Sequence, residues 1–266
     1  MQHLQLKNSV KHQEDLMRIK NFRLIDNDFM TICFEDSIEC VELVLRIILD
    51  KPDLKVTEVH TQRFLKNLTK RSVQLDIYAV DASDIRYNIE IQRDDKGAGV
   101  KRARYNSSVL DTRILPSGDD TDNLTETYVI FITENDVIGK GMPVYPVERY
   151  ILNTGELFGD GSHILYVNGE YREDTPVGRL MHDFFCTNPD DMYYKVLADR
   201  VRYFKENKKG VAMMCKAMEE MCNKAKEENK MQIALNMIRE GILTLEKIAE
   251  YCELTIEEVQ ELKTNI

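Results

Sequence analysis

Two carboxylate residues on neighbouring predicted strands are the clearest candidates for chemistry in this sequence. The stretch from Val73 to Gln92 contains two runs in which apolar and polar residues alternate, and a polar turn separates them. Alternation with a period of two is typical of a β-hairpin with one buried face. A loop of about five residues around Asp81 to Ile85 would place Asp76 directly opposite Glu90 on the other face.

Carboxylates opposed in this way repel each other unless a cation lies between them. Directly opposed Cβ atoms lie ~5 Å apart, and hard divalent cations prefer carboxylate and carbonyl oxygens. Asp76 and Glu90 therefore suggest a Mg²⁺ or Mn²⁺ site on the hairpin. The alternative is an ordinary acidic pair on a solvated strand face, and the spacing alone favours this second interpretation.

Charge is distributed unevenly along the chain. The net charge of −10 argues by itself against binding to nucleic acid. The segment from His60 to Arg104, however, has a local balance of +4, because six acidic residues there stand against ten basic ones: Arg63, Lys66, Lys70, Arg71, Arg86, Arg93, Lys96, Lys101, Arg102 and Arg104. Basic residues that bracket an acidic hairpin suit a metal-dependent enzyme acting on a polyanion. A solvated surface of mixed charge would give the same pattern.

Cysteine usage and hydropathy point to an intracellular protein. The six cysteines include no C-x-x-C pair, which argues against a zinc knuckle and predicts reduced thiols. No run approaches the ~18 consecutive apolar residues of a membrane span, and the polar N-terminus lacks the hydrophobic region of a signal peptide. We expect a soluble, cytoplasmic protein that does not enter a membrane.

The periodicity of the first two thirds of the chain predicts an α/β core with a mixed central sheet flanked by helices. Ser37 or Asp36 can cap a helix that runs to about Asp50. The further expected elements are strands at Val56–His60, Thr127–Thr133 and His163–Asn168, a helix at Val100–Leu115, and the hairpin already described. The run at Thr127–Thr133 is continuously apolar, which is typical of a strand buried on both faces.

The last third of the chain is predicted to be all-helical. Its methionine and leucine periodicity indicates helices near Asp190–Asn207, Gly210–Asn229 and Lys230–Glu240. Thr244 and Thr255 each precede a short amphipathic helix, which gives the outline of a helix-turn-helix. The second of these helices is strongly acidic and would repel phosphates, so we expect packing or homo-oligomerisation through the C-terminal helices rather than DNA reading.

Several segments, in this order and spacing, carry a resemblance to a known family. They are FEDSIECVELVLRIIL, LDIYA, NIEIQR, KRARYNSSVLD, YVIFITEND, HILYVNGEY and LMHDFFCTNPDDM. The chain resembles the PD-(D/E)XK nuclease family transposases, the Rpn-like group of recombination-promoting nucleases. The resemblance covers roughly residues 28–207, and residues 241–262 look like the family's ending. We therefore expect an N-terminal extension at 1–27, a nuclease core at 28–187, a helical region at 188–240 and a small tail at 241–266.

This resemblance implies a restriction-endonuclease-like core with its active site on the hairpin, and it moves the metal-site interpretation ahead of the solvated pair. Asp76 looks like the aspartate of the PD motif, although Leu75 replaces the proline. Glu90-Ile91-Gln92 looks like the E-x-K motif, with glutamine in place of lysine. The resemblance implies that Asp76, Glu90 and the Ile91 carbonyl hold the metal.

The resemblance also assigns residues on two helices. Glu39 matches an acidic position that the wider fold often supplies to the metal site from its first helix. Arg102 and Tyr105 match an R-x-x-Y pattern on the helix after the hairpin, where they could hold a phosphate. Together with Lys101 and Arg104, they are the expected DNA-binding residues.

The function implied is a metal-dependent DNA endonuclease, associated with recombination or mobile elements and using Mg²⁺ or Mn²⁺. Asp76, Glu90 and Gln92 would be its catalytic residues. Gln92 can orient a water by hydrogen bonding but brings no charge. The alternative is therefore a catalytically silent nucleic-acid-binding or oligomerising protein on the same fold. No DDE-type triad is apparent, so the family label does not imply strand transfer.

Overall fold

The computed structural model describes residues 13–65, 73–93, 95–115 and 118–264. The chain divides into two compact units, residues 1–207 and 208–266. The first unit holds the sheet and the hairpin, and the second is entirely helical in its described part. The boundary between the units lies after α6 (Lys195–Glu206).

The first unit begins with helical residues 13–21 and then alternates helices and strands. Its further elements are α2 (Asn27–Phe34), α3 (Ile38–Leu49), β1 (Val56–Leu65), β2 (Val73–Asp81), β3 (Arg86–Gln92), η1 (Asp95–Ala98), α4 (Val100–Ile114), η2 (Thr121–Asn123), β4 (Thr127–Thr133), β5 (Val144–Val147), β6 (Tyr150–Ile151), β7 (Glu156–Leu157), β8 (Ser162–Asn168), α5 (Pro176–Phe185), η3 (Pro189–Asp191) and α6.

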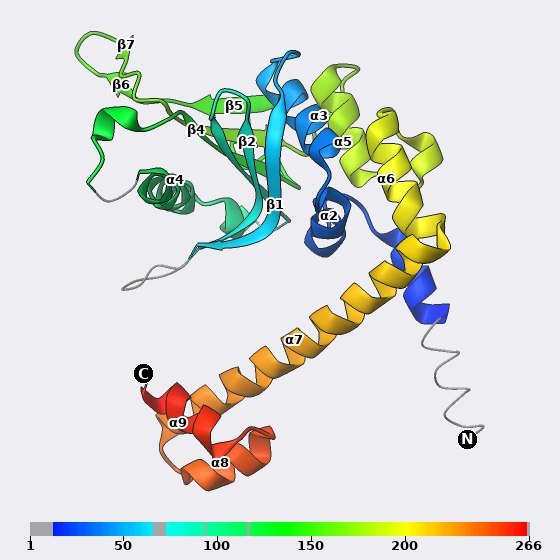
Figure 1. Ribbon diagram of the computed structural model, residues 1–266, viewed down its shortest axis with the longest axis vertical. Coiled ribbons are helices and arrows are strands. Elements are labelled where there is room, and N and C mark those ends of the chain that lie inside the picture. Colours follow the sequence, from blue (N-terminus) through cyan, green and yellow to red (C-terminus); the bar gives the residue numbers. More distant parts are fainter. Residues whose placement is uncertain (1–12, 66–72, 94, 116–117, 265–266) are drawn as a thin grey trace. The chain divides into compact units, whose positions relative to one another are not determined.

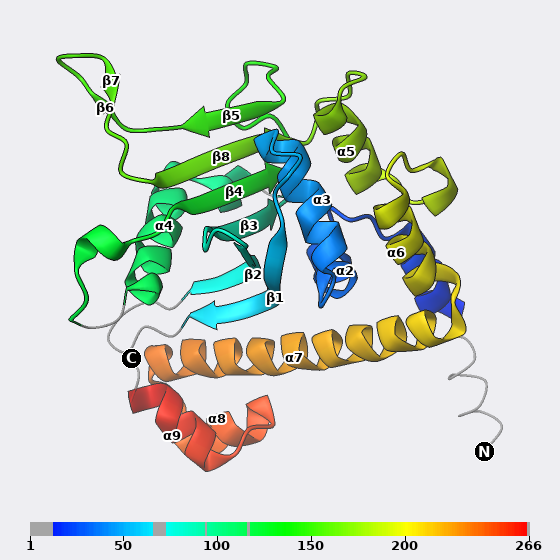
Figure 2. The same ribbon diagram turned by 45° about the horizontal axis from the view of Figure 1, so that its top comes forward.

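Within the described residues, six strands form a mixed sheet in the order β1-β2-β3-β4-β8-β5 (Figure 2). The first three strands are an antiparallel meander, β3, β4 and β8 run parallel, and β5 pairs antiparallel with β8. A parallel neighbour requires a crossover connection, and α4 lies in the connection from β3 to β4. The first turn of α4 is thereby close to the end of β3.

Helices cover both faces of this sheet (Figure 1). On one face, α4 packs its buried Ala103, Val109 and Leu110 against strand residues that include Val129 and Phe131. On the other face lie α2, α3 and α5. Our expectation that the hairpin has one solvated face was wrong, because α4 folds back over the face that carries the polar side chains.

Most core elements follow the sequence pattern closely. β4 has the predicted bounds and is buried at every position, and α3 runs between Ser37 and Asp50 as expected. The prediction of two helices divided near Asn229 was wrong, since α7 is continuous from Lys208 to Glu240. Neither Asn229 nor Lys230 is a helix breaker, because only Gly and Pro interrupt a helix at substantial cost.

In the second unit, α8 (Leu245–Cys252) and α9 (Ile256–Thr264) pack with the end of α7 around a small apolar cluster: Ala234, Ile248, Ala249, Cys252 and Val259. Thr244 caps α8 by accepting a hydrogen bond from the Lys247 N–H. Thr255 and Glu258 form a reciprocal capping box at the start of α9. These caps explain why two such short helices form at the expected positions.

Two further expectations concern the whole chain. All six cysteines are free thiols, as their spacing indicated. In the part of the chain that the structure describes, no helix has the length and apolar character that spanning a membrane requires.

Lys205 connects three segments of the first unit. It is buried in α6, and its Nζ donates hydrogen bonds to the carbonyl oxygens of Lys20, Phe22 and Thr187. The ammonium also lies 5.4 Å from the centroid of the Phe29 ring. Lys205 thus anchors the segment before α2 to the end of the core.

We expect Lys205→Met to destabilise the first unit by about 2–4 kcal/mol, because three buried carbonyls lose their donor. Urea denaturation followed by circular dichroism measures this loss. Lys195→Met is the matched control, since Lys195 lies on the same helix but is exposed and pairs with Asp199, and it should change stability little. Equal stability of the two variants would contradict the anchoring role.

Candidate functional site

The site is built on the hairpin of β2 and β3, whose register brings its two carboxylates together. Ile77 pairs with Ile89 and Tyr78 with Asn88, and the same register continued by one residue sets Asp76 opposite Glu90. Both side chains are buried, at 7% and 0% exposure. The pair therefore lies on the covered face of the sheet beneath α4, not on a solvated face.

Asp76 is held by the backbone of the neighbouring strand. The N–H of Ile91 donates to Asp76 Oδ2 at 3.0 Å. In a strand, the N–H and C=O of one residue point to the same side. The Ile91 carbonyl therefore also points towards β2, the strand that carries Asp76.

Glu90 is held by side chains alone in its described hydrogen bonds. Asn88 Nδ2 donates to Glu90 Oε1 at 3.1 Å, and Arg102 Nη2 donates to Glu90 Oε2 at 2.8 Å. Gln92 Nε2 lies 3.5 Å from the same Oε2, at the long limit of a hydrogen bond. Asn88, Glu90 and Gln92 alternate along β3 and so share one face.

Burial makes ionisation of this pair unfavourable. It raises the pKa of Glu90 to about 7, with the charge of Asp76 adding to the rise and Arg102 and Asn88 opposing it. Burial also raises the pKa of Asp76 to about 6, against the opposing effects of the Ile91 N–H and Arg102. The positive charge near the pair therefore offsets only part of the cost of burying the two carboxylates.

Gln92 is positioned by its contact with Gly97. A Cβ atom added at Gly97 would overlap the Gln92 side-chain carbonyl. The glycine therefore leaves room for the amide beside Glu90, and the chain turns there through η1 into α4. This explains why a glycine stands at the break that the sequence places after β3.

Of the four residues expected on α4, only Arg102 contacts the carboxylate pair among the described interactions. Lys101 and Arg104 are exposed on the same helix, and neither takes part in an ion pair within the described chain. Tyr105 is half-buried and packs against the core cluster beneath α4. The structure thus separates one arginine inside the site from two basic residues on the surface around it.

The structure does not bring Glu39 to this site. Glu39 is exposed in the first turn of α3, which packs against β1, α5 and α6. The helix α3 lies on the face of the sheet opposite α4 (Figure 1), so Glu39 is not beside the carboxylate pair. Lys66, Lys70 and Arg71 of the expected basic bracket lie outside the described residues.

Sequence reasoning did not assign a role to Asn88. Its side chain is fully buried and supports Glu90. Its position in the sequence could have identified it. Asn88 precedes Glu90 by two residues on a strand, so the two side chains must lie on the same face.

The donor set at Asp76 and Glu90 fits a hard divalent cation. Two carboxylates and a carbonyl directed towards them are oxygen ligands, and Mg²⁺ is usually bound by one or two carboxylates together with waters or substrate phosphates. Asn88 Oδ1 is buried beside Glu90 without a hydrogen-bond partner in the structure. Among the described residues no group of three or more His, Cys, Asp or Glu side chains is placed to hold a metal ion.

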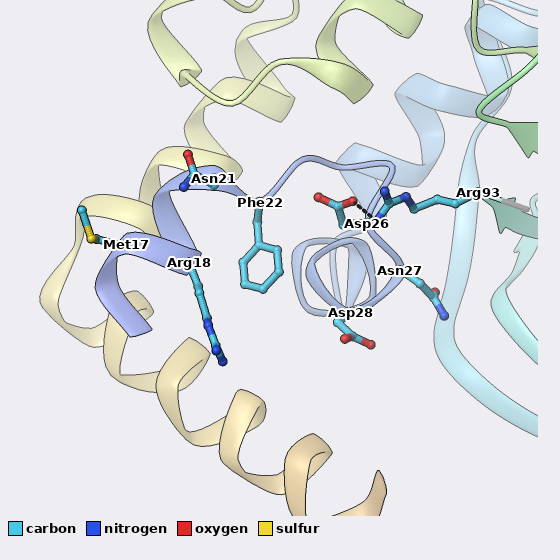
Figure 3. Close-up of a pocket in the computed structure, with 8 residues that line it drawn as sticks. All are labelled: Met17, Arg18, Asn21, Phe22, Asp26, Asn27, Asp28 and Arg93. Carbon is cyan, nitrogen blue, oxygen red and sulfur yellow. Dashed lines mark ion pairs between the residues drawn. The ribbon is translucent and has the colours of Figure 1, made fainter. Parts of the chain in front are cut away.

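A cavity of about 590 Å³ lies near the end of β3 but is separate from this pair (Figure 3). It is lined by Met17, Arg18, Asn21, Phe22, Asp26, Asn27, Asp28 and Arg93. Arg93 follows Gln92 directly, yet its side chain pairs with Asp26 at 3.0 Å and with Glu134 at 3.2 Å. Since Asp76, Glu90 and Arg102 do not line it, the cavity is not the candidate site.

Residues 42–171 match the family model of the PD-(D/E)XK nuclease family transposases. This confirms the resemblance over β1 to β8, the segment that contains Asp76, Glu90 and α4. The six-stranded mixed sheet flanked by helices is consistent with the restriction-endonuclease-like α/β fold, and the match indicates a nuclease-like function. No curated protein and no solved structure matches the chain significantly.

The buried pair predicts a stability that depends on pH. In the folded chain Glu90 keeps its proton to about pH 7, whereas its ordinary pKa is 4.5. The folded state therefore binds more protons than the unfolded state between these values, and stability falls as pH rises through this window. Through Glu90 alone, the metal-free protein should lose on the order of 3 kcal/mol between about pH 4 and pH 8.

Urea denaturation at several pH values in EDTA measures this loss. Glu90→Gln should flatten the profile and be more stable than the natural chain at about pH 8, because a neutral amide is buried at lower cost than a carboxylate. Asp190→Asn, which changes an exposed carboxylate, should keep the natural profile. A profile as steep in Glu90→Gln as in the natural chain would contradict the pKa assignment.

Proposed function

We propose, from the PD-(D/E)XK match over residues 42–171, that the chain is a metal-dependent endonuclease that hydrolyses phosphodiester bonds of DNA. The observation that carries the proposal is the buried pair Asp76 and Glu90, opposed on β2 and β3 beneath the first turn of α4. Two buried carboxylates with raised pKa values are costly to the fold, and such arrangements cluster at functional sites.

In this proposal Asp76, Glu90 and the Ile91 carbonyl hold one Mg²⁺ or Mn²⁺ ion. When bound, such an ion lowers the pKa of a coordinated water and neutralises charge on the reacting phosphate. The reaction adds the oxygen of water to phosphorus and breaks one bridging P–O bond, and the departing oxygen gains a proton.

The side chains around the pair have separate roles. Gln92 lies beside Glu90 in space that is free because Gly97 has no side chain. Its amide orients the attacking water and brings no charge. Lys101 and Arg104, exposed on α4, bind phosphates of the DNA backbone and position the strand. The association with recombination or mobile elements follows from the family description alone.

Nicking of supercoiled plasmid with Mg²⁺ or Mn²⁺ tests the proposal. Glu90→Gln and Asp76→Asn should each lower the nicking rate by about 100-fold or more, because each removes a charged ligand. Glu39→Gln is the comparison, since Glu39 is exposed on the opposite side of the sheet, and it should nick at the natural rate. Equal nicking by all four proteins would place the activity elsewhere or in a contaminant.

The alternative function predicts a different result. If the natural chain binds DNA but no metal produces nicks, it is a silent nucleic-acid-binding protein on this fold. The observation that favours this alternative is the uncharged Gln92 at the position of the motif lysine.

Gln92 allows the two possibilities to be separated. Gln92→Ala should lower the nicking rate by about 10- to 100-fold, because loss of one preorganised hydrogen-bond donor at an active site typically lowers kcat by about 100-fold or more. Binding of Mn²⁺, measured by calorimetry, should be preserved because Gln92 is not among the proposed ligands. Unchanged nicking in Gln92→Ala would remove Gln92 from the mechanism.

A further inference from the structure

Arg102 makes a contact that conflicts with a simple phosphate-binding role. Its guanidinium donates to Glu90 Oε2 at 2.8 Å, and Glu90 is fully buried whereas the Arg102 side chain is 44% exposed. One end of the guanidinium therefore binds Glu90, a proposed metal ligand, while the rest of the Arg102 side chain reaches solvent. Arginine carries five N–H donors, so donors remain available on the exposed side.

The neighbours of Arg102 make the exposed side suitable for a polyanion. Most arginines in the described part of the first unit pair with carboxylates, as Arg93 does with Asp26 and Arg149 with Asp160. Lys101 and Arg104 flank Arg102 on α4 and have no ion pair within the described residues. Of these three basic residues, Arg102 is thus the one whose charge is paired with a carboxylate of the site.

Charge balance indicates when that contact is needed. Asp76 and Glu90 are buried together, and among the described side chains Arg102 is the cation that pairs with Glu90. Without a metal, its removal would leave the pair without a positive partner. With a divalent cation on the carboxylates, the same guanidinium would add a surplus positive charge and be repelled.

We propose that Arg102 is a phosphate contact controlled by metal binding: it pairs with Glu90 while the carboxylates hold no cation, and it leaves Glu90 for a DNA phosphate once they do. This inference rests on the proposed function, and it adds a regulatory role to one residue of that site. Its consequence is that the chain binds DNA tightly only when the site is loaded.

A double-mutant cycle on DNA binding tests the exchange. Binding of a labelled duplex is measured by fluorescence anisotropy in EDTA and in Ca²⁺, which takes the same oxygen ligands. The natural chain should bind about tenfold more tightly in Ca²⁺. Glu90→Gln should bind about tenfold more tightly than the natural chain in EDTA, because Arg102 is already released. Glu90→Gln/Arg102→Gln should lose this gain.

Arg104→Gln is the matched control, with the same change of residue type on the same helix. It should weaken DNA binding by the same factor in EDTA and in Ca²⁺, because the charge of Arg104 is available in both states. A gain in Glu90→Gln that persists without Arg102 would show only reduced repulsion of the DNA, and would overturn the inference.

Metal binding without DNA provides a second readout. Mn²⁺ affinity is measured by calorimetry at about pH 8.5, where proton competition at Glu90 is small. Arg102→Gln should bind Mn²⁺ about tenfold more tightly than the natural chain, since the competing cation is gone. Arg104→Gln should keep the natural affinity. Equal Mn²⁺ affinity in Arg102→Gln and the natural chain would overturn the inference.

The two proposals fail in different ways. Metal-dependent nicking combined with a negative result in either assay leaves the endonuclease proposal intact and removes the role given to Arg102. Absence of both nicking and DNA binding in every variant removes the endonuclease proposal, and the inference falls with it.

Discussion

The burial of two opposed carboxylates is the constraint on which the architecture of this site depends. Asp76 and Glu90 occupy adjacent strands on a face that α4 covers, so neither is solvated as an ordinary acidic residue would be. The Ile91 N–H, the Asn88 amide and the Arg102 guanidinium each compensate part of their charge. Burial still raises the pKa of both carboxylates, so this compensation is incomplete.

The topology of the sheet explains how these groups meet. Because β3 and β4 are parallel, the chain must cross over between them, and α4 makes this crossing. Gly97 permits the close approach to Gln92 just before the helix starts. The first turn of α4 is thus near the end of β3, and Arg102 can reach Glu90 although twelve residues separate them.

The sequence predicted local features better than features set by packing between distant segments. Strand parity was sufficient to oppose Asp76 and Glu90, and the continuous apolar run of β4 was sufficient to predict burial on both faces. The sequence pattern could not show that α4 would bury the polar face of the hairpin. The helix α5 was not anticipated, and its buried Asp183 is bound by the Tyr193 and Tyr194 N–H groups and lies 3.2 Å from the His182 ring nitrogen, contacts that appear only in the folded chain.

Asp183 and Glu90 show why burial alone does not identify a functional carboxylate. Both are fully buried. The oxygens of Asp183 accept hydrogen bonds from two backbone N–H groups, which are fixed by the fold and suit a structural role. The described partners of Glu90 are all side chains, and one of them, Arg102, is almost half exposed. Side-chain partners can change rotamer and exchange for other ligands, whereas backbone donors cannot do so without unfolding the segment. A carboxylate whose described partners are all exchangeable is suited to bind and release a cation, and this property distinguishes Glu90 from Asp183, which has two fixed backbone donors.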